Sequence, residues 1–494
     1  MFPPPSRRGF LKSVAALAGG TVFAGAGDTF FGGRVFAQNP PGGCPAPPTG
    51  GTHFAPGSDT RPIVLRKSIS ALTTAETSKL KSAYAALRAL PASDKRTWVL
   101  QADMHALFCA SCTGTATDIH GTWNFFPWHR AYLYYYERIL GSLVGDIDHF
   151  RLPNWDWENG RTLPSIYRSP NSAANSLWDG TRNSAMAGGG NLPVNDGSTA
   201  RVHTLLAITD FVTFGGTASA AGTMEGNPHG HIHTDVGLPS PPYHDMGNLG
   251  YAARDPLFFA HHCNIDKIWS NWNARAGGSG LPPNAYKNPT NAAFLNARWS
   301  FYDEQQHVVS MSAADVLDHG ANLRYTYDIA RFNIPALQLV YVCKLTCCLP
   351  GPEAGSFLEA PEEAREGIVQ SSRGQSPLLL VLQGVSVPAN ATGIFEVLSV
   401  RNERRLHLGS FSIVPHSGGG THQSLQTVVL DIGEAAGDLL ARENPAALRV
   451  VRRSPEREGY KDEAEMLRSE RKLTYAFDLK AEHAEIRAEQ PATR

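Results

Sequence analysis

The sequence predicts a mainly α-helical, loop-rich domain followed by a small C-terminal β-sandwich. Three segments, residues 71–90, 126–143 and 256–269, show the apolar spacing of helices. Beyond residue 375 the pattern changes to short apolar runs separated by turn residues, which is typical of a sandwich. The chain has 494 residues. A single core rarely serves more than about 250–300 residues, so we expect two folded units.

The three expected helices differ in character. In the first, helical spacing is shown by Leu72, Leu80, Tyr84, Leu87 and Leu90. The second is apolar on all sides and rich in aromatic residues, which indicates a buried helix. The third begins at Asp255-Pro256, where the aspartate can cap the helix and proline suits the first helical position. Residues 165–225 are mostly small and polar, and predict excursions over the surface.

Prolines and glutamates interrupt the chain at about residues 350–375, before the strand-like runs. These runs are residues 378–382, 394–398, 411–414, 426–430, 448–451 and 473–479. We therefore expect a signal segment at 1–37, a helical domain at 38–350, a linker at 351–375, a β-sandwich at 376–485 and a tail at 486–494.

The composition is that of a globular protein, with 42% hydrophobic residues, 18% charged residues and a net charge of −1. A charge so close to zero argues against a nucleic-acid surface or an electrostatic membrane patch. The 47 glycines and 34 prolines suit a loop-rich fold. The sequence gives no indication of the oligomeric state.

Residues 1–37 have the features of an export signal. The pair Arg7-Arg8 precedes a weakly apolar stretch from Ser13 to Gly27. This order resembles a bacterial twin-arginine (Tat) signal, the alternative being a chance arginine pair before an apolar helix. The stretch is shorter than the ~20 residues of a transmembrane helix, and no later segment qualifies. We expect export by the Tat machinery, a periplasmic or secreted location and no stable membrane span.

Six histidines fall into two groups of three. The groups are His105, His120 and His129, and His229, His233 and His262. On a helix, His229 and His233 lie one turn apart on one face, so both imidazoles can bind one ion. Imidazole is a good ligand for copper. Such a pair is also common on surfaces without a metal. His231 points to another side of this helix, and we interpret it as incidental.

The run from Asp255 to Trp269 carries two adjacent histidines, His261 and His262. Consecutive residues of a helix point about 100° apart, so only one of them should face the metal. Asp266 lies one turn after His262. It is a candidate for orienting this part of the site through hydrogen bonds.

These motifs together resemble the type 3 copper proteins, the group of tyrosinases, catechol oxidases and haemocyanins. Asp-Pro-x-Phe before His262, with Asp266 four residues later, is similar to the second copper signature of that group. Phe-Phe-Pro-x-His-Arg around His129 is similar to the first signature of plant-type polyphenol oxidases. The resemblance covers about residues 60–450. It implies a four-helix bundle that holds two copper ions, Cu A and Cu B, with O2 as co-substrate. It assigns His262 rather than His261 to Cu B.

The resemblance also implies a role for one of the seven cysteines, which are Cys44, Cys109, Cys112, Cys263, Cys343, Cys347 and Cys348. Their odd number leaves at least one thiol without a disulfide partner. In the family, a cysteine at the position of Cys109 forms a thioether with the ring of the second ligand, here His120. The alternatives are a disulfide from Cys109 to Cys44 or Cys112, or a merely buried thiol. We expect a Cys44–Cys112 disulfide.

Three positions correspond to substrate-tuning residues of the family. Leu249 matches the gate residue over the entrance, where leucine leaves a more open mouth than phenylalanine. Glu225 matches the glutamate that holds a water, which can act as general base for a phenol; the alternative is a solvated loop carboxylate. The usual partner of that glutamate is an asparagine, but here Gly230 stands in its place. This departure disfavours monophenol hydroxylation.

The sequence therefore predicts a copper-dependent polyphenol oxidase that converts small phenolic substrates, the o-diphenols, to o-quinones. A tyrosinase with monophenol hydroxylation and an o-aminophenol oxidase are the close alternatives. A haemocyanin-like O2 carrier is the alternative from another class. By analogy with plant-type enzymes, the C-terminal sandwich is expected to shield the copper site.

Overall fold

The computed structural model describes residues 45–109, 119–237, 245–329, 334, 336–347, 355–365, 377–388, 391–402, 404–414, 425–442, 444–453 and 475–489. The expected signal segment 1–37 and the expected Cys44–Cys112 disulfide lie outside these residues. Within the described part, no helix has the length and apolarity needed to cross a membrane. The described residues belong to one compact unit, which contains both the helices and the sheet described below.

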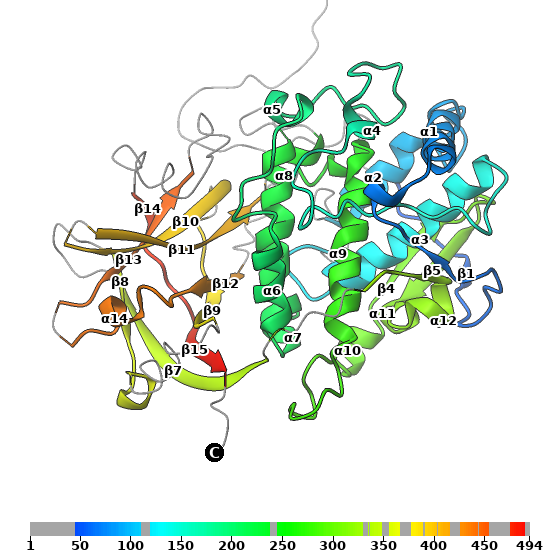
Figure 1. The fold of residues 1–494 in the computed structure, drawn as a ribbon. Coiled ribbons are helices and arrows are strands. Elements are labelled where there is room, and N and C mark those ends of the chain that lie inside the picture. The colour runs from blue at the N-terminus through cyan, green and yellow to red at the C-terminus, as the bar shows by residue number, and fades with distance from the viewer. Residues whose placement is uncertain are drawn as a thin grey trace, which may run out of the picture. The chain divides into compact units, whose positions relative to one another are not determined.

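Five helices build the part of the fold that carries the histidines (Figure 1). They are α1 (Thr74–Arg88), α2 (Trp98–Phe108), α3 (Phe125–Leu143), α8 (Gly230–Val236) and α9 (Leu257–Asn273). The helices expected at 71–90, 126–143 and 256–269 are confirmed as α1, α3 and α9. Helix α1 begins at a capping box between Thr73 and Glu76. That box satisfies two backbone N–H groups at the start of the helix.

The expectation that residues 165–225 only cross the surface is wrong. Helix α6 (Thr199–Ala207) lies there and buries Val202, Leu205 and Leu206. The side chain of Ser198 caps it by accepting from the backbone N–H of Arg201. A short apolar stretch behind an N-cap is sufficient for a helix when tertiary packing buries one face of it.

The remaining helical segments are short. They are η2 (Ile69–Ala71), α4 (Ser165–Arg168), α5 (Ser184–Ala187), α7 (Phe211–Gly215), η3 (Glu225–His229), η4 (Asp245–Gly247), η5 (Ala252–Arg254), α10 (Ala292–Leu295), α11 (Ala313–Val316), α12 (His319–Leu323) and α14 (Ala436–Leu439). Two of them adjoin the histidine groups: η3 runs directly into α8, and η4 follows α8 along the chain.

The C-terminal part is a large, mostly antiparallel sheet, drawn in yellow-green to red in Figure 1. Its strands run in the order β11-β10-β13-β8-β7-β15-β9-β12-β3, and β14 pairs with β13. Their bounds are β3 (Ala220–Ala221), β7 (Leu337–Cys347), β8 (Ser356–Glu359), β9 (Leu379–Val385), β10 (Gly393–Arg401), β11 (Arg404–Ile413), β12 (Leu425–Asp431), β13 (Ala447–Arg452), β14 (Tyr475–Phe477) and β15 (His483–Glu489). We call strands β7 to β15 the C-terminal sheet. It begins before the segment 351–375 that we expect to be a linker.

The five other strands form two small sheets. One has the order β1-β5-β4, with β1 (Thr52–His53), β5 (Val308–Ser312) and β4 (Arg298–Tyr302). The other pairs β2 (Val64–Leu65) with β6 (Tyr325–Thr326).

Two large apolar cores and one small cluster of three residues lie in the described part of the chain. The larger one lies among the helices, and the second lies inside the C-terminal sheet around Phe395, Phe411 and Ile486. Strands β11 and β12 stand far apart in the sheet order, yet Gly409 of β11 lies against Leu430 of β12. The sheet therefore doubles back on its own core. Val414 and Val429 belong instead to the helical core, so the sheet packs directly on the helices.

Candidate metal centre

The first histidine group joins α2, the segment before α3, and α3 itself. His105, His120 and His129 are at most 3% exposed. Their candidate ligand atoms all lie within 4.8 Å of one another. Nε2 of His129 is 3.3 Å from Nε2 of His105. Two nitrogens bound to one ion at about 2.0 Å with a tetrahedral angle lie about 3.3 Å apart, so this spacing fits one shared metal.

The second group contains four histidines rather than the expected three. His229, His233, His261 and His262 are buried, and their candidate ligand atoms lie within 4.8 Å of one another. The ring centroids of His229 are 4.5 Å from His233 and 4.9 Å from His262. His229 ends η3 and His233 lies on α8, so the sequence spacing of the pair becomes one helical turn as expected.

The two groups lie against each other in the interior of the helical part. The rings of His129 and His262 stack at 4.2 Å between centroids with an interplanar angle of 5°. The rings of His120 and His229 lie 6.0 Å apart. The six histidines expected from the sequence are therefore brought together in a single centre.

The adjacent pair His261 and His262 have different neighbours. His262 stacks on His129 of the first group, and its ring is 4.2 Å from that of Phe258. His261 lies next to His229 and His233, with Trp157 on its other side at 6.5 Å. The sequence argument, that one of the two should turn away from the metal, missed that both come within reach of this group.

The imidazoles are held in the form that metals bind. Nδ1 of His129 lies 2.7 Å from the Phe125 carbonyl oxygen, and Nδ1 of His233 lies 2.9 Å from that of Met246. A hydrogen on Nδ1 that donates to a carbonyl leaves the lone pair on Nε2 for a metal. Burial lowers the pKa of His129 to about 3 and that of His233 to about 4, so both are neutral at pH 7.

The donor set fits a pair of copper ions. Nε2 of His229 and Nε2 of His233 are buried and have no hydrogen-bond partner among the described residues. Burial lowers the pKa of His229 and of His262 well below the usual range, and neighbouring histidines lower it further. Several neutral, buried imidazoles aimed at one place are costly unless a cation accepts their lone pairs.

Asp266 lies in a buried network, but its hydrogen bonds differ from those expected. Its carboxylate accepts from Arg130 Nε at 2.6 Å, and from the hydroxyls of Tyr325 and Tyr327 at 2.6 and 2.8 Å. Among the described residues, its hydrogen-bond partners are arginine and tyrosine side chains and not an imidazole. Burial favours a higher pKa for Asp266, but Arg130 and Arg66 hold it below the ordinary value. Through Arg130, Asp266 is joined to helix α3, which carries His129.

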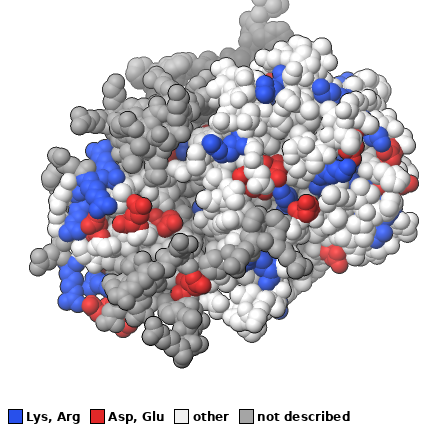
Figure 2. Space-filling model, in the orientation of Figure 1, with Lys and Arg blue, Asp and Glu red and all other residues white. Residues whose placement is uncertain are grey.

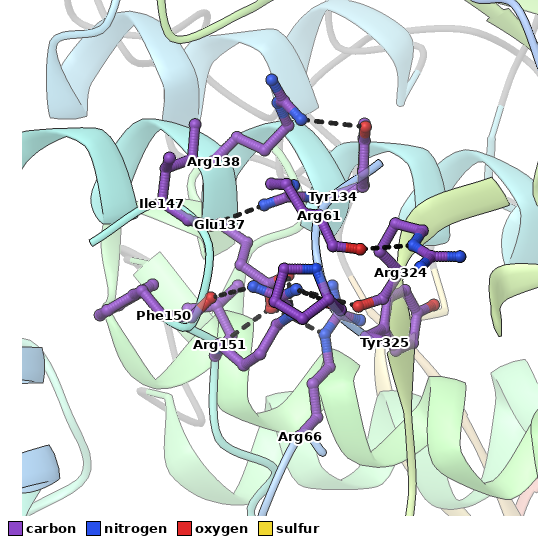
Figure 3. Close-up of polar contacts among 12 residues, drawn as sticks. Arg61, Arg66, Tyr134, Glu137, Arg138, Ile147, Phe150, Arg151, Arg324 and Tyr325 are labelled. Atoms are coloured by element: carbon purple, nitrogen blue, oxygen red, sulfur yellow. Dashed lines mark hydrogen bonds and ion pairs between the residues drawn. The ribbon is translucent and has the colours of Figure 1, made fainter. Parts of the chain in front are cut away.

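The same network continues through Arg66, which lies 3.4 Å from Asp266, to Glu137 of α3. Nε of Arg66 donates to Glu137 at 2.8 Å, and Arg151 lies 3.6 Å from the other oxygen of Glu137 (Figure 3). Glu137 also accepts from the backbone N–H of Leu152. The charges thus alternate in sign through the interior, which is the condition for burying them at tolerable cost.

A small cavity lies beside His229. It measures about 30 Å³, and its walls are Gly121, Glu225, Gly226, His229, Leu249, Ser412, Ile413, Val414 and Gln426. The structure thus brings the expected gate residue Leu249 and the expected glutamate Glu225 to the same place. Oε1 of Glu225 accepts from the backbone N–H of Gly121 at 2.7 Å, so this carboxylate is fixed in the wall.

Gly230, the third expected tuning position, faces the C-terminal sheet. A Cβ atom on Gly230 would lie 2.2 Å from Oγ of Ser412 and 3.2 Å from a methyl carbon of Val414. Oγ of Ser412 donates to the carbonyl oxygen of Gly226 at 2.6 Å. The end of β11 therefore occupies the space that a side chain at position 230 needs.

Cys109 is buried at the C-terminal end of α2, next to the helical turn of His105. The backbone N–H of Ile119 donates to the carbonyl oxygen of Phe108 at 3.1 Å. That bond places Ile119, which precedes His120, beside Phe108, which precedes Cys109. The thioether between Cys109 and His120 stays a prediction.

The expectation that His231 points away from the metal site is confirmed, because it belongs to neither histidine group, but it has a buried acidic partner that was not expected. Its side chain is fully buried, and Nδ1 lies 2.8 Å from Oδ1 of Asp196, which is also fully buried. Asp196 is 35 residues away in sequence, and no local pattern signals such a pair.

Comparisons with known proteins agree with this centre. Residues 95–205 and 179–275 match the family model of the common central domain of tyrosinase. Residues 288–337 match that of the polyphenol oxidase middle domain. The chain is 37% identical over 303 residues to the latent, chloroplastic polyphenol oxidase of Prunus armeniaca. This alignment covers 54% of the chain and 49% of the relative, about half of its length.

Solved structures give the same family. A polyphenol oxidase of Grenache grape (Vitis vinifera) is 31% identical, with a TM-score of 0.51, covering 60% of this chain and 95% of that one. Latent apple tyrosinase has a TM-score of 0.61 over 88% of this chain and 98% of its own, and its 22% identity bears on the fold alone. With two facing histidine groups on this fold, the chain belongs to the tyrosinase family of type 3 copper proteins.

Proposed function

We propose that the chain is a polyphenol oxidase that oxidises o-diphenols to o-quinones with O2. The observation that carries this proposal is the pair of buried histidine groups that meet at His129 and His262, 4.2 Å apart. The balanced reaction takes two diphenols and one O2 to two quinones and two waters. Family membership and the fit of the donor set support copper as the metal.

We assign the ligands of Cu A as His105, His120 and His129, and those of Cu B as His229, His233 and His262. When bound, the two coppers supply the two-electron redox chemistry with O2. His261 is not assigned as a ligand; its ring stacks beside that of His229. Two observations support this choice: His262 rather than His261 stacks on the first group, and Asp266 follows His262 by one helical turn.

The protein contributes geometry and a dry interior. The Nδ1 contacts of His129 and His233 with backbone carbonyls hold each ring in one tautomer. The aromatic rings of Phe125 and Phe258 line the space between the groups and exclude water. A phenol enters this space beside Glu225, whose fixed carboxylate can hold a water near the phenolic proton.

Diphenol oxidation is favoured over monophenol hydroxylation. Position 230, where the family carries the asparagine that shares the glutamate's water, is glycine. This departure disfavours the hydroxylation of monophenols. Tyrosinase-type hydroxylation and o-aminophenol oxidation are the neighbouring activities that the test below separates.

The C-terminal sheet is proposed to be a β-sandwich that keeps the enzyme latent, next to a four-helix bundle of α2, α3, α8 and α9. The cavity beside His229 holds about 30 Å³, whereas a cavity that binds benzene measures about 150 Å³. On the side of the C-terminal sheet, the cavity is bounded by Ser412, Ile413 and Val414. A phenol therefore reaches the metals only after this sheet has moved or been cleaved.

Two further proposals rest on the sequence. The Arg7-Arg8 segment directs export by the Tat pathway to the periplasm or the medium. Cys109 forms a thioether with His120, supported by the hydrogen bond that draws Ile119 to the end of α2. Mass spectrometry tests both, by the mature N-terminus and by a loss of two hydrogens in the linked peptides.

The activity is tested with copper-loaded protein, before and after limited proteolysis, by following O2 uptake and quinone absorbance. Catechol, tyrosine and o-aminophenol are supplied side by side. We expect rapid catechol oxidation after proteolysis, with much slower turnover of tyrosine. Reversible O2 binding without quinone formation from a fully loaded chain contradicts the oxidase and identifies a carrier instead.

A further inference from the structure

Helix α8 presents two pairs of polar side chains in opposite directions. His229, at its start, and His233 face the metal centre. His231 and Asp235 are also four residues apart, and lie two residues along from the first pair. Two residues correspond to about 200° on a helix, so this second pair points away from the metals.

The second pair meets a buried charged cluster. Nδ1 of His231 lies 2.8 Å from Oδ1 of Asp196, and both side chains are fully buried. Asp196 is in turn bound by Arg453, whose Nη1 and Nη2 donate to its two oxygens at 2.5 and 3.2 Å. Nη1 of Arg453 also lies 3.6 Å from Asp235. One guanidinium thus contacts Asp235 directly and reaches His231 through Asp196.

Arg453 is part of the C-terminal sheet, directly after β13. Its Nε donates to Glu396 of β10 at 2.6 Å. The second oxygen of Glu396 lies 2.5 Å from Nε2 of His407 on β11. The cluster therefore joins the sheet (Glu396, His407, Arg453) to the helical part.

Two of the three acids that Arg453 contacts, Asp196 and Glu396, are ionised. Burial favours a higher pKa for Asp196, yet Arg453 and His231 hold it well below the usual range. Glu396 is similarly buried, and Arg453 and His407 lower its pKa to about 2. Arg453 is the one cation bonded to both carboxylates among the described residues. Without it, buried carboxylates would lose their counter-charge, which is strongly unfavourable.

We propose that Arg453 is a positioning residue for α8, which couples the seating of the C-terminal sheet to metal binding by His229 and His233. When the C-terminal sheet packs on the helices, Arg453 holds Asp196 and Asp196 holds His231. These contacts fix the position of the turn of α8 that carries His229 and His233. Coupling of this kind is reciprocal, so metal binding also stabilises the seated sheet. The inference rests on the proposed metal site. It adds a second role for the C-terminal sheet, which would hold the helix that carries two ligands of Cu B as well as shield the site.

The test compares full-length Arg453→Met with wild type, using Arg404→Met as the matched control. Arg404 is also an arginine of the sheet and pairs with an acid, Asp438, but its side chain is 60% exposed. Cu(I) affinity is measured by competition with a chromophoric chelator. We expect about tenfold weaker binding of one of the two coppers in Arg453→Met, with no change in Arg404→Met. Arg453→Lys should recover part of the loss, because it restores the charge without the forked geometry.

Amide hydrogen exchange supplies a readout that a general loss of stability does not mimic. In wild type, copper loading should slow exchange in β10 (Gly393–Arg401) as well as in α8, and in Arg453→Met only α8 should respond. If Arg453→Met does not fold, the nearly isosteric Asp196→Asn takes its place with the same expected pattern. Equal copper affinities in variant and wild type, or equal protection of β10 in both, overturn the inference.

The coupling and the proposed oxidase activity fail in different experiments. Normal diphenol oxidation together with unchanged copper affinity in Arg453→Met contradicts the coupling alone. Coupled copper binding in a chain that oxidises no diphenol contradicts the proposed activity alone.

Discussion

Asp266 on α9 accepts a 2.6 Å hydrogen bond from Nε of Arg130 on α3, and this bond joins the helices that carry His262 and His129. Each partner lies next to a candidate ligand: Arg130 follows His129 directly, and Asp266 lies one turn after His262. The guanidinium of Arg130 also lies over the ring of Trp269 at 3.7 Å. This buried ion pair therefore ties together the two helices that carry His129 and His262.

Replacement of Asp266 by asparagine should destabilise the chain strongly. The substitution leaves Arg130 and Arg66 buried without their shared carboxylate, and loss of one partner from a buried pair costs about 3–5 kcal/mol. Urea unfolding of the metal-free protein measures this change. Asp438→Asn, which weakens partly exposed pairs with Arg401 and Arg404, should cost less than about 1 kcal/mol. A loss as small in Asp266→Asn as in the control would contradict the role of the ion pair.

Alanine substitutions of the adjacent histidines His261 and His262 should change the copper content differently. His262→Ala should bind one copper per chain instead of two, because it removes a ligand of Cu B. His261→Ala should keep two, with a lower affinity for the second. Metal analysis after gel filtration measures both. The reverse result would show that the ligand of Cu B is His261.

Asparagine at position 230 should open the latent enzyme. Gly230 has helical dihedral angles, φ −67° and ψ −27°, so the backbone accepts asparagine. The new side chain would however collide with Ser412, which lies 2.2 Å from the site of its Cβ. We expect a several-fold rise in diphenol oxidation by full-length Gly230→Asn without proteolysis. Gly437→Asn is the control, because no atom lies within 4 Å of a Cβ there.

The same variant tests the choice between the two phenol reactions. After proteolysis, Gly230→Asn should raise the ratio of tyrosine to catechol turnover, because the amide can share the water held by Glu225. An unchanged ratio in the opened enzyme would mean that Gly230 does not limit monophenol hydroxylation.

The metal-free protein should lose stability as the pH falls below about 6.5. Burial lowers the pKa of His129 to about 3 and of His233 to about 4, from an ordinary value of 6.5. Between these limits the unfolded chain binds more protons than the folded one, so acid favours unfolding. Each such histidine contributes a slope of up to about 1.4 kcal/mol per pH unit. Bound copper blocks protonation and should shift the loss to lower pH; identical profiles with and without copper would contradict this.

Local spacing made three of the helices and the six histidines predictable. The apolar repeats of 71–90 and 126–143 appear as α1 and α3, and the six histidines meet as expected. The strands expected after residue 375 also appear, because each is a short apolar run bounded by turn residues. These features depend on neighbours in sequence, which a single sequence displays directly.

Long-range contacts were not predictable in the same way. β7 and β15 pair with each other in the middle of the sheet order. The apolar residues of β15 alternate with polar ones and give a weaker signal, and β7 lies before the break at 350–375 after which strands were expected. The role of His231 depends on Asp196 and Arg453, which are remote from it in sequence. The approach of His261 to the metal group likewise results from the packing of α8 against α9.

The copper content of the folded chain, measured together with its O2 consumption on catechol, tests the central claim most directly. The account predicts two coppers per chain and, once the C-terminal sheet is released by proteolysis, one O2 consumed for every two catechols oxidised. Fewer than two coppers in the folded protein, or two coppers with no catechol oxidation by the opened enzyme, would contradict it.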